Sequence, residues 1–83
     1  MKNEDQLQQL LNKDYFPIIY RNIKKFRKES GISLAKVAEI LDMSYDYLRR
    51  IESDNDLMKT CSLKLLIKFS ILYNKSLDEF IKE

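Results

Sequence analysis

Few side chains of this sequence could carry out chemistry at a site. The chain has no histidine and a single cysteine, Cys61, so it lacks the three or four nitrogen and sulfur ligands of a zinc site. It has one glycine, Gly31, and therefore no glycine-rich phosphate loop. The scattered carboxylates that remain give poor support to a small enzyme. We expect no catalytic site, no metal and no other cofactor, and we interpret Cys61 as a small, half-buried filler.

The composition indicates one helical domain. The chain has 83 residues, of which 34% are charged and 45% hydrophobic, and this is the composition of a soluble globular protein. One glycine and one proline leave too few turn residues for a sandwich or barrel of short strands. No apolar run is long enough to span a membrane, and the acidic start does not resemble a signal peptide. A lone cysteine fits a reducing compartment, and we expect a cytoplasmic protein.

Positive charge gathers in the middle of the chain. Residues 17–52 carry a net charge of +3, whereas residues 1–16 carry −1 and residues 53–83 carry none. The most informative stretch lies inside this basic segment. Ser33 can cap a helix from Leu34 to Leu41, and Ser44 can cap a second helix from Tyr45 to Glu52. A turn of about three residues joins them, which is the spacing of a DNA-binding helix-turn-helix.

The inner face of this pair supports the same interpretation. A small residue, Ala38, allows the two helix axes to cross closely, and the apolar residues expected beside it are Val37, Leu41, Met43, Leu48 and Ile51. The second helix would then lie on the outside of the domain, where it could enter a major groove about 12 Å wide.

Further helices must support this pair. The pattern predicts an amphipathic helix from Asn3 to about Lys13, with Leu7, Leu10 and Leu11 on one face. A second helix runs from Ile18 to Ser30 and ends at Gly31 in a left-handed conformation. Pro17 either breaks the chain before this helix or lies in its first turn. A polar stretch at residues 53–56 stops the chain before an apolar helix from Ser62 to Tyr73. Ser76 and Glu79 form a capping box for the last helix.

The run IKKFRKESGISLAKVAEILDMSYDYLRRIE, followed by SLKLLIKFSILYNKSLDEFI, resembles the Cro/repressor-type (XRE-like) helix-turn-helix domain of bacterial and phage regulators. The resemblance implies an all-α fold, namely a five-helix phage-repressor-like domain with an additional N-terminal helix. The domain would occupy residues 17–83 and the helical extension residues 1–16. The resemblance also implies binding of operator DNA, usually as a dimer.

The same resemblance implies roles for individual residues. Positions that usually face base edges are occupied by Tyr45, Asp46 and Arg50, and Arg49 is expected to reach a base or a phosphate. Arginine can bind guanine through O6 and N7, and aspartate can accept a hydrogen bond from cytosine N4. An exposed solvated face is the alternative for both arginines, and packing against neighbouring helices is the alternative for Tyr45 and Tyr47.

Phosphate contacts are implied at the ends of the helices. The expected residues are Arg27, Ser33, Leu34 (through its backbone amide), Ser44, Tyr47, Asn55 and Lys59. Arg27 and Glu52 also match a pair that ties helix ends together, and a structural role fits this pair better than a functional one. Lys36 is expected to be a surface charge.

The sequence departs from the family pattern at four positions. Leu34 stands where a glutamine side chain often reaches a phosphate, so only its amide can serve. Asp42 stands in the turn where the family often has glycine, and aspartate tolerates the left-handed conformation. Asp54 and Asp56 lie in a longer loop where many relatives carry basic residues. Two carboxylates near the DNA backbone would weaken binding.

The helix at residues 62–73 has more apolar side chains than one face can hold. We expect Leu63, Leu66, Ile67 and Ser70 on its inner face. The surplus, Leu65, Ile71 and Leu72, is a candidate dimer surface, which either the N-terminal helix or a second copy would cover.

The sequence therefore predicts a sequence-specific transcriptional regulator, in particular a repressor that binds a two-half-site operator as a homodimer. The alternative is a protein-interaction module of the same fold, with an apolar helix that docks a protein partner and with weak or no DNA binding.

Overall fold

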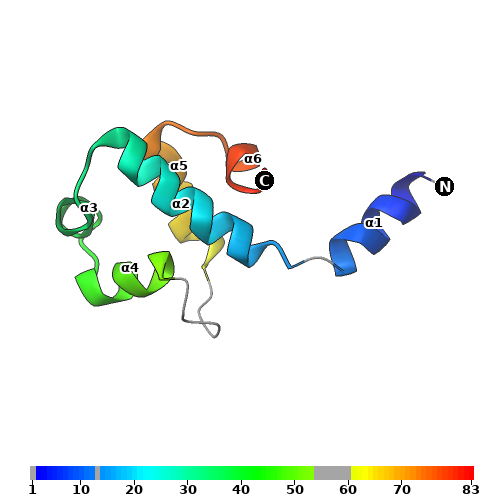
Figure 1. Cartoon of the computed structure of the whole chain (residues 1–83), viewed down its shortest axis with the longest axis horizontal. Helices are drawn as coiled ribbons and strands as arrows, with labels where there is room; N and C mark the ends of the chain where they lie inside the picture. Colours follow the sequence, from blue (N-terminus) through cyan, green and yellow to red (C-terminus); the bar gives the residue numbers. More distant parts are fainter. Residues whose placement is uncertain (1, 13, 54–60) are drawn as a thin grey trace.

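In the computed structural model the described residues are 2–12, 14–53 and 61–83, and every element within them is a helix (Figure 1). The helices, in chain order, are α1 (Lys2–Asn12), α2 (Phe16–Ser30), α3 (Leu34–Leu41), α4 (Tyr45–Glu52), α5 (Leu63–Tyr73) and α6 (Leu77–Phe80). The prediction of an all-α fold with an extra N-terminal helix is confirmed. No described helix is both long enough and apolar enough to cross a membrane.

Serine side chains begin four of the helices, as the sequence predicts. The hydroxyls of Ser33, Ser44 and Ser62 accept hydrogen bonds from backbone amides in the first turns of α3, α4 and α5, at 3.1, 3.3 and 3.1 Å. At α6 the Ser76 amide donates to the Glu79 carboxylate at 2.7 Å. This hydrogen bond lowers the pKa of Glu79, so the cap contributes at neutral pH and is lost as the pH falls through that lowered pKa.

Left-handed residues end three of the helices. Gly31 (φ 70°) ends α2, Asp42 (φ 52°) ends α3, and Asn74 (φ 55°) ends α5. Asn and Asp tolerate this conformation better than other residues with a Cβ. The predictions for Gly31 and Asp42 are confirmed. The exposed Asp42 adopts the positive φ for which many turns of this kind use glycine.

Replacing Asp42 by valine should therefore lower the free energy of unfolding by roughly 1–2 kcal/mol, because a β-branched side chain fits a positive φ poorly. Thermal or denaturant unfolding measures the change. Asp42→Gly is the matched control and should cost little, since glycine adopts this φ without strain. An equal loss in both variants would show that the Asp42 side chain, and not its φ, matters.

Of the two positions expected for Pro17, the structure has the one in the first turn of α2, and this helix starts earlier than expected. The helix begins at Phe16, two residues before Ile18, and takes Pro17 into its first turn. Proline is well suited there because its missing amide would have no helical partner. The Phe16 amide, which also lacks a helical partner, donates to the Asp14 carboxylate at 3.0 Å. The first turn is thus fixed by Asp14 and Pro17 together.

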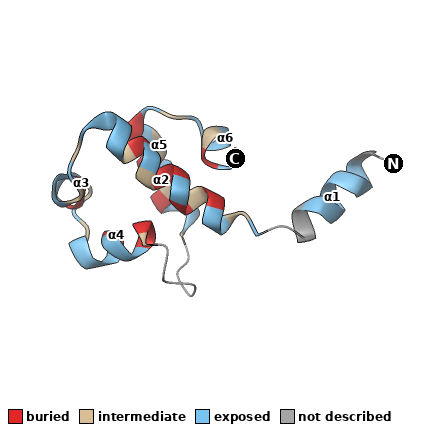
Figure 2. Cartoon of the chain, in the orientation of Figure 1, coloured by how far each residue is buried: buried red, intermediate tan, exposed pale blue. Residues whose placement is uncertain are grey.

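The core forms where α4, α5 and α6 meet α2. Ile23 and Phe26 of α2 are buried, and the Phe26 ring lies edge-on to Phe80 of α6 with centroids 5.0 Å apart. Figure 2 shows the buried residues on α2 and on the neighbouring helices, whereas the described side chains of α1 are exposed. The Cys61 side chain is half-buried against this core, and burial raises the pKa of its thiol to about 11.

The predicted inner face of α5 is wrong in part. Leu63 and Ile67 are exposed, whereas Leu66 is partly buried against the core as expected and Ser70 is half-buried. The fully buried residues are Leu65, Phe69 and Tyr73 (relative exposure 4, 2 and 5%). Two rings decide the orientation, because Phe69 and Tyr73 stack at 5.8 Å and aromatic side chains bury the largest apolar areas. Leu65 therefore belongs to the core and not to a dimer surface. Leu72 is partly buried against the core, and Ile71 alone of the three expected residues is well exposed, at 76%.

Asn22 fastens the end of the chain, a role that the sequence did not reveal. Its side-chain amide is buried on α2 and donates to the carbonyl oxygens of Phe80 and Lys82, both at 2.8 Å. These carbonyls lie at the end of α6 and just beyond it, where a helix leaves acceptors without partners. Asn22 therefore holds the C-terminal residues against α2.

Candidate nucleic-acid interface

The helices α3 and α4 form a tightly turned pair. The Met43 amide donates to the Ala38 carbonyl at 2.9 Å, and the Asp42 amide donates to the Glu39 backbone carbonyl at 3.2 Å. Ala38 is buried on α3, and Leu48 and Ile51 of α4 are each 1% exposed. The small residue and the two buried anchors are those expected from the sequence. They hold α4 by its inner side against the core and leave its other side at the surface.

The outer side of α4 brings the expected base-reading residues together. Tyr45, Asp46, Arg49 and Arg50 are all exposed, and at 100° per residue they share one side of the helix. The Asp46 carboxylate lies 3.9 Å from Nε of Arg49. Tyr45 is 48% exposed and does not pack into the core. The side presented to solvent thus combines two cations, one anion and an aromatic hydroxyl.

Residues expected at phosphates lie at the N-termini of α3 and α4. The hydroxyls of Ser33 and Ser44 accept the capping hydrogen bonds, and each can still donate its own proton. Tyr47 is 39% exposed in the first turn of α4. Leu34 is half-buried against the core through its side chain, which leaves its backbone amide as the group that could serve. Both N-termini therefore offer donors at the positive ends of helix dipoles.

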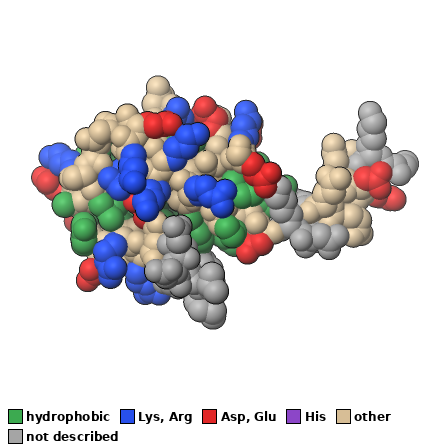
Figure 3. All heavy atoms as spheres, in the orientation of Figure 1, with side chains coloured by type: hydrophobic (Ala, Val, Ile, Leu, Met, Phe, Trp, Pro, Cys, Tyr) green, Lys and Arg blue, Asp and Glu red, His purple; other side chains and the backbone are tan. Residues whose placement is uncertain are grey.

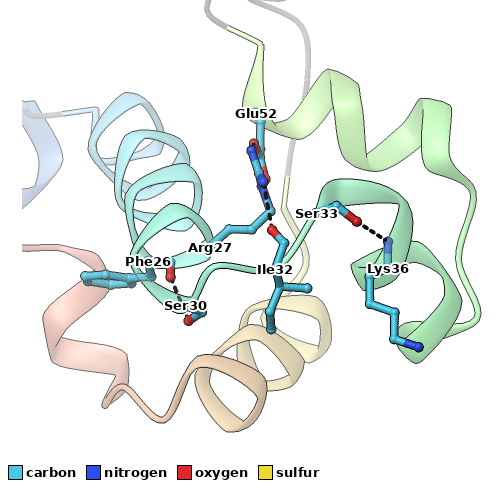
Figure 4. Close-up of polar contacts among 7 residues, drawn as sticks. All are labelled: Phe26, Arg27, Ser30, Ile32, Ser33, Lys36 and Glu52. Carbon is cyan, nitrogen blue, oxygen red and sulfur yellow. Dashed lines mark hydrogen bonds and ion pairs between the residues drawn. The ribbon is translucent and has the colours of Figure 1, made fainter.

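The Arg27 side chain, on α2, contacts both the end of α4 and the loop before α3 (Figure 4). Its Nε and terminal nitrogen donate to the two carboxylate oxygens of Glu52 at 2.7 and 3.0 Å, and its other terminal nitrogen donates to the Ile32 carbonyl at 2.9 Å. The expected ion pair is thus present, and it is largely buried, with side-chain exposures of 15% for Arg27 and 8% for Glu52. Hydrogen bonding to Glu52 raises the pKa of Arg27 above its ordinary value. The pair ties the end of α4 to α2 and to the loop before α3.

Tyr73 lies close enough to Arg27 and Glu52 to interact electrostatically with both. Burial is the main cause that raises the Tyr73 pKa to about 12, and the Glu52 carboxylate adds to it. The Tyr73 hydroxyl has no hydrogen-bond partner among the described residues. The phenol is therefore neutral at physiological pH and serves the core through its ring.

Other charges complete the surface around the pair. Lys36 forms an exposed ion pair with Glu39 at 3.6 Å, in line with a surface charge. Figure 3 shows Lys and Arg side chains (blue) spread over the body of the molecule, with acidic groups among them. Asn55 and Lys59, expected at phosphates, and the acidic Asp54 and Asp56 lie outside the described residues. No group of three potential metal ligands occurs in the described parts of the chain.

A family model described as helix-turn-helix matches residues 23–80, which is more than half of the chain. The chain belongs to the helix-turn-helix family of Cro/repressor type. This family assignment makes it a DNA-binding regulator of transcription, and the helix-turn-helix pair is α3 and α4. No curated protein and no solved structure matched the chain.

The helix-turn-helix match covers α3, α4, α5 and α6 completely, together with the second half of α2. It leaves out α1, which stands clear of the body in Figure 1. Sequence reasoning missed two residues, Ile32 of the loop before α3, whose carbonyl accepts a hydrogen bond from Arg27, and Asn22, which holds the C-terminal residues against α2. Neither carries a sequence signal, because one is a polar residue in a helix and the other acts through its backbone carbonyl.

Proposed function

We propose that this protein is a sequence-specific repressor that binds a two-half-site operator as a homodimer. The observation that carries the proposal is the position of α4. Leu48 and Ile51 anchor its inner side, and Tyr45, Asp46, Arg49 and Arg50 are exposed on its outer side. A helix held in this way fits the major groove of duplex DNA.

Each exposed residue has a chemical role in this proposal. Arg50 donates two hydrogen bonds to guanine O6 and N7, and Arg49 reaches a neighbouring base or a phosphate. Asp46 accepts a hydrogen bond from cytosine N4. Tyr45 contacts a thymine methyl group with its ring and donates through its hydroxyl.

The phosphate contacts fix the position of α4 in the groove. Ser33 and the Leu34 amide bind one phosphate at the N-terminus of α3, and Ser44 and Tyr47 bind another at the N-terminus of α4. The main role of Arg27 is the ion pair, but its guanidinium group has N–H donors left over that could bind a phosphate. Asn55 and Lys59 are proposed to contact further phosphates of the DNA backbone.

Repression follows from occupancy. A dimer on a two-half-site operator covers promoter DNA and carries out no chemistry on it. Binding to genomic DNA places the action of the protein in the cytoplasm. Residues 17–83 act as the DNA-binding domain and residues 1–16 as a helical extension.

A protein-interaction module is the second candidate, and one observation favours it. The Asp46 side chain is 83% exposed on the outer side of α4, where a carboxylate repels phosphates. A protein partner would then replace DNA.

Binding to duplex DNA as a function of salt separates the two candidates. Between about 50 and 200 mM salt a dimer that neutralises about six phosphates should lose roughly a thousandfold in affinity. Selection of bound sites from random duplexes should also yield an inverted repeat. A protein-interaction module would bind weakly at both salt concentrations and would select no sequence.

A further inference from the structure

The outward face of α5 carries an apolar surface that the core does not use. Leu63, Ile67 and Ile71, called here the outer stripe, are 66, 41 and 76% exposed. Their spacing of four residues places them along one face of the helix. Three large aliphatic side chains aligned in this way favour burial against another element.

A second apolar surface belongs to α1. The described side chains of this helix, Asn3 to Gln9, are all exposed, and Leu7 is 53% exposed. The sequence spaces the leucines at positions 7, 10 and 11 as on one helix face. A helix of 11 residues is marginal in water without tertiary contacts. A stable α1 therefore needs a surface on which to pack.

The chain directs α1 away from its own core. Between the end of α1 at Asn12 and the start of α2 at Phe16 the backbone can span only about 14 Å. The Asp14 carboxylate fixes the Phe16 amide, and the Phe16 ring stacks on Tyr20 at 5.8 Å, so the entry into α2 is defined. Figures 1 and 3 show α1 standing clear of the body. These features favour a partner outside the chain.

Charge indicates which partner surface fits. The outer stripe is bordered by Lys64 and Lys68, and α5 has no acidic residue. Two outer stripes packed against each other would bring four lysines together. By contrast α1 carries Glu4 and Asp5 in its first turn, and Glu4 lies on the leucine face, three residues before Leu7. The leucine face of α1 thus complements the outer stripe in both polarity and charge.

We propose that α1 of one copy packs on the outer stripe of a second copy, and that the second copy returns the same contact. This reciprocal exchange forms a closed two-fold dimer. The inference rests on the proposed function for the role of the dimer, and it assigns the surface that forms it.

Cross-linking in the full chain tests the arrangement, with Cys61→Ser as the common background. One chain carries Leu7→Cys, and a second chain, made heavier by a tag, carries Ile67→Cys. A short bis-maleimide added to the mixture should link the light chain to the heavy chain. In the double variant Leu7→Cys/Ile67→Cys the main product should be a linked dimer.

Three outcomes would overturn the exchange. A link within one chain of the double variant would place α1 on its own α5. Linked pairs of the Ile67→Cys chain alone would show two outer stripes in contact. No link in any mixture would leave the outer stripe uncovered.

Analytical ultracentrifugation measures how much each surface contributes to the stability of the dimer. Leu7→Glu and Ile67→Glu should each raise the dimer dissociation constant about tenfold or more, because each removes a buried aliphatic side chain. Ile40→Glu, which changes a residue 50% exposed on α3, is the matched control and should leave dissociation unchanged. An equal effect in the control, or none in the two stripe variants, would contradict the proposal.

DNA binding separates this inference from the proposed function. The dimerisation variants should bind a single half-site duplex with unchanged base preference. Should the unmodified protein bind no duplex, the repressor assignment fails while the cross-linking result still decides the exchange.

Discussion

Replacing Arg27 by alanine is expected to lower the free energy of unfolding by roughly 3 kcal/mol and the Tm by about 12–24 °C. The loss is large because the Glu52 carboxylate, only 8% exposed, would remain buried without its partner. The Ile32 carbonyl would also lose the donor that lies at 2.9 Å. Thermal unfolding followed by circular dichroism measures the change.

The double variant Arg27→Leu/Glu52→Leu is the control for this explanation. Removing both charges leaves no buried ion, so the double variant should be more stable than Arg27→Ala. A Tm of Arg27→Ala equal to that of the unmodified protein would contradict a structural role. Base preference at permissive temperature should stay unchanged, because Arg27 reads no base.

Replacing Arg50 by alanine should relax sequence preference at one base position by about 1–3 kcal/mol, or roughly 5- to 150-fold. A bidentate contact to guanine is lost, because alanine has no side-chain donor. Sites selected from random duplexes by the variant and by the unmodified protein measure the difference. Stability should change by no more than about 0.5 kcal/mol, since Arg50 lies on the exposed side of α4.

Lys36→Ala provides the control for Arg50→Ala. Lys36 is a surface charge paired with Glu39, so its loss should alter affinity evenly across sequences, if at all. An unchanged base preference in Arg50→Ala would remove this residue from the recognition of DNA.

Local signals made much of this fold predictable. Serine at an N-cap satisfies amides that no helix can satisfy itself, so Ser33, Ser44, Ser62 and Ser76 mark helix starts directly. Gly31 and Asp42 mark helix ends because few residues accept a positive φ. The outer side of α4 followed from these boundaries, since Leu48 and Ile51 leave only one way to turn the helix.

The orientation of α5 could not be obtained in this way. Apolar residues surround that helix, so periodicity hardly distinguishes one face from another, and the choice falls to how Phe69 and Tyr73 fit beside α2. Asn22 is a similar case. A polar residue in a helix is normally expected at the surface. Only the folded structure shows that backbone carbonyls of Phe80 and Lys82, far away in the sequence, accept its hydrogen bonds.

The fastening of the C-terminal residues by Asn22 has a practical consequence. In Figure 1 the last residue lies near the start of α2, on the far side of the body from α3. A fluorophore or surface tether attached to Glu83 would therefore sit at a fixed anchor remote from the helix-turn-helix pair. Single-molecule experiments could immobilise the protein there while leaving its reading side open to the solution.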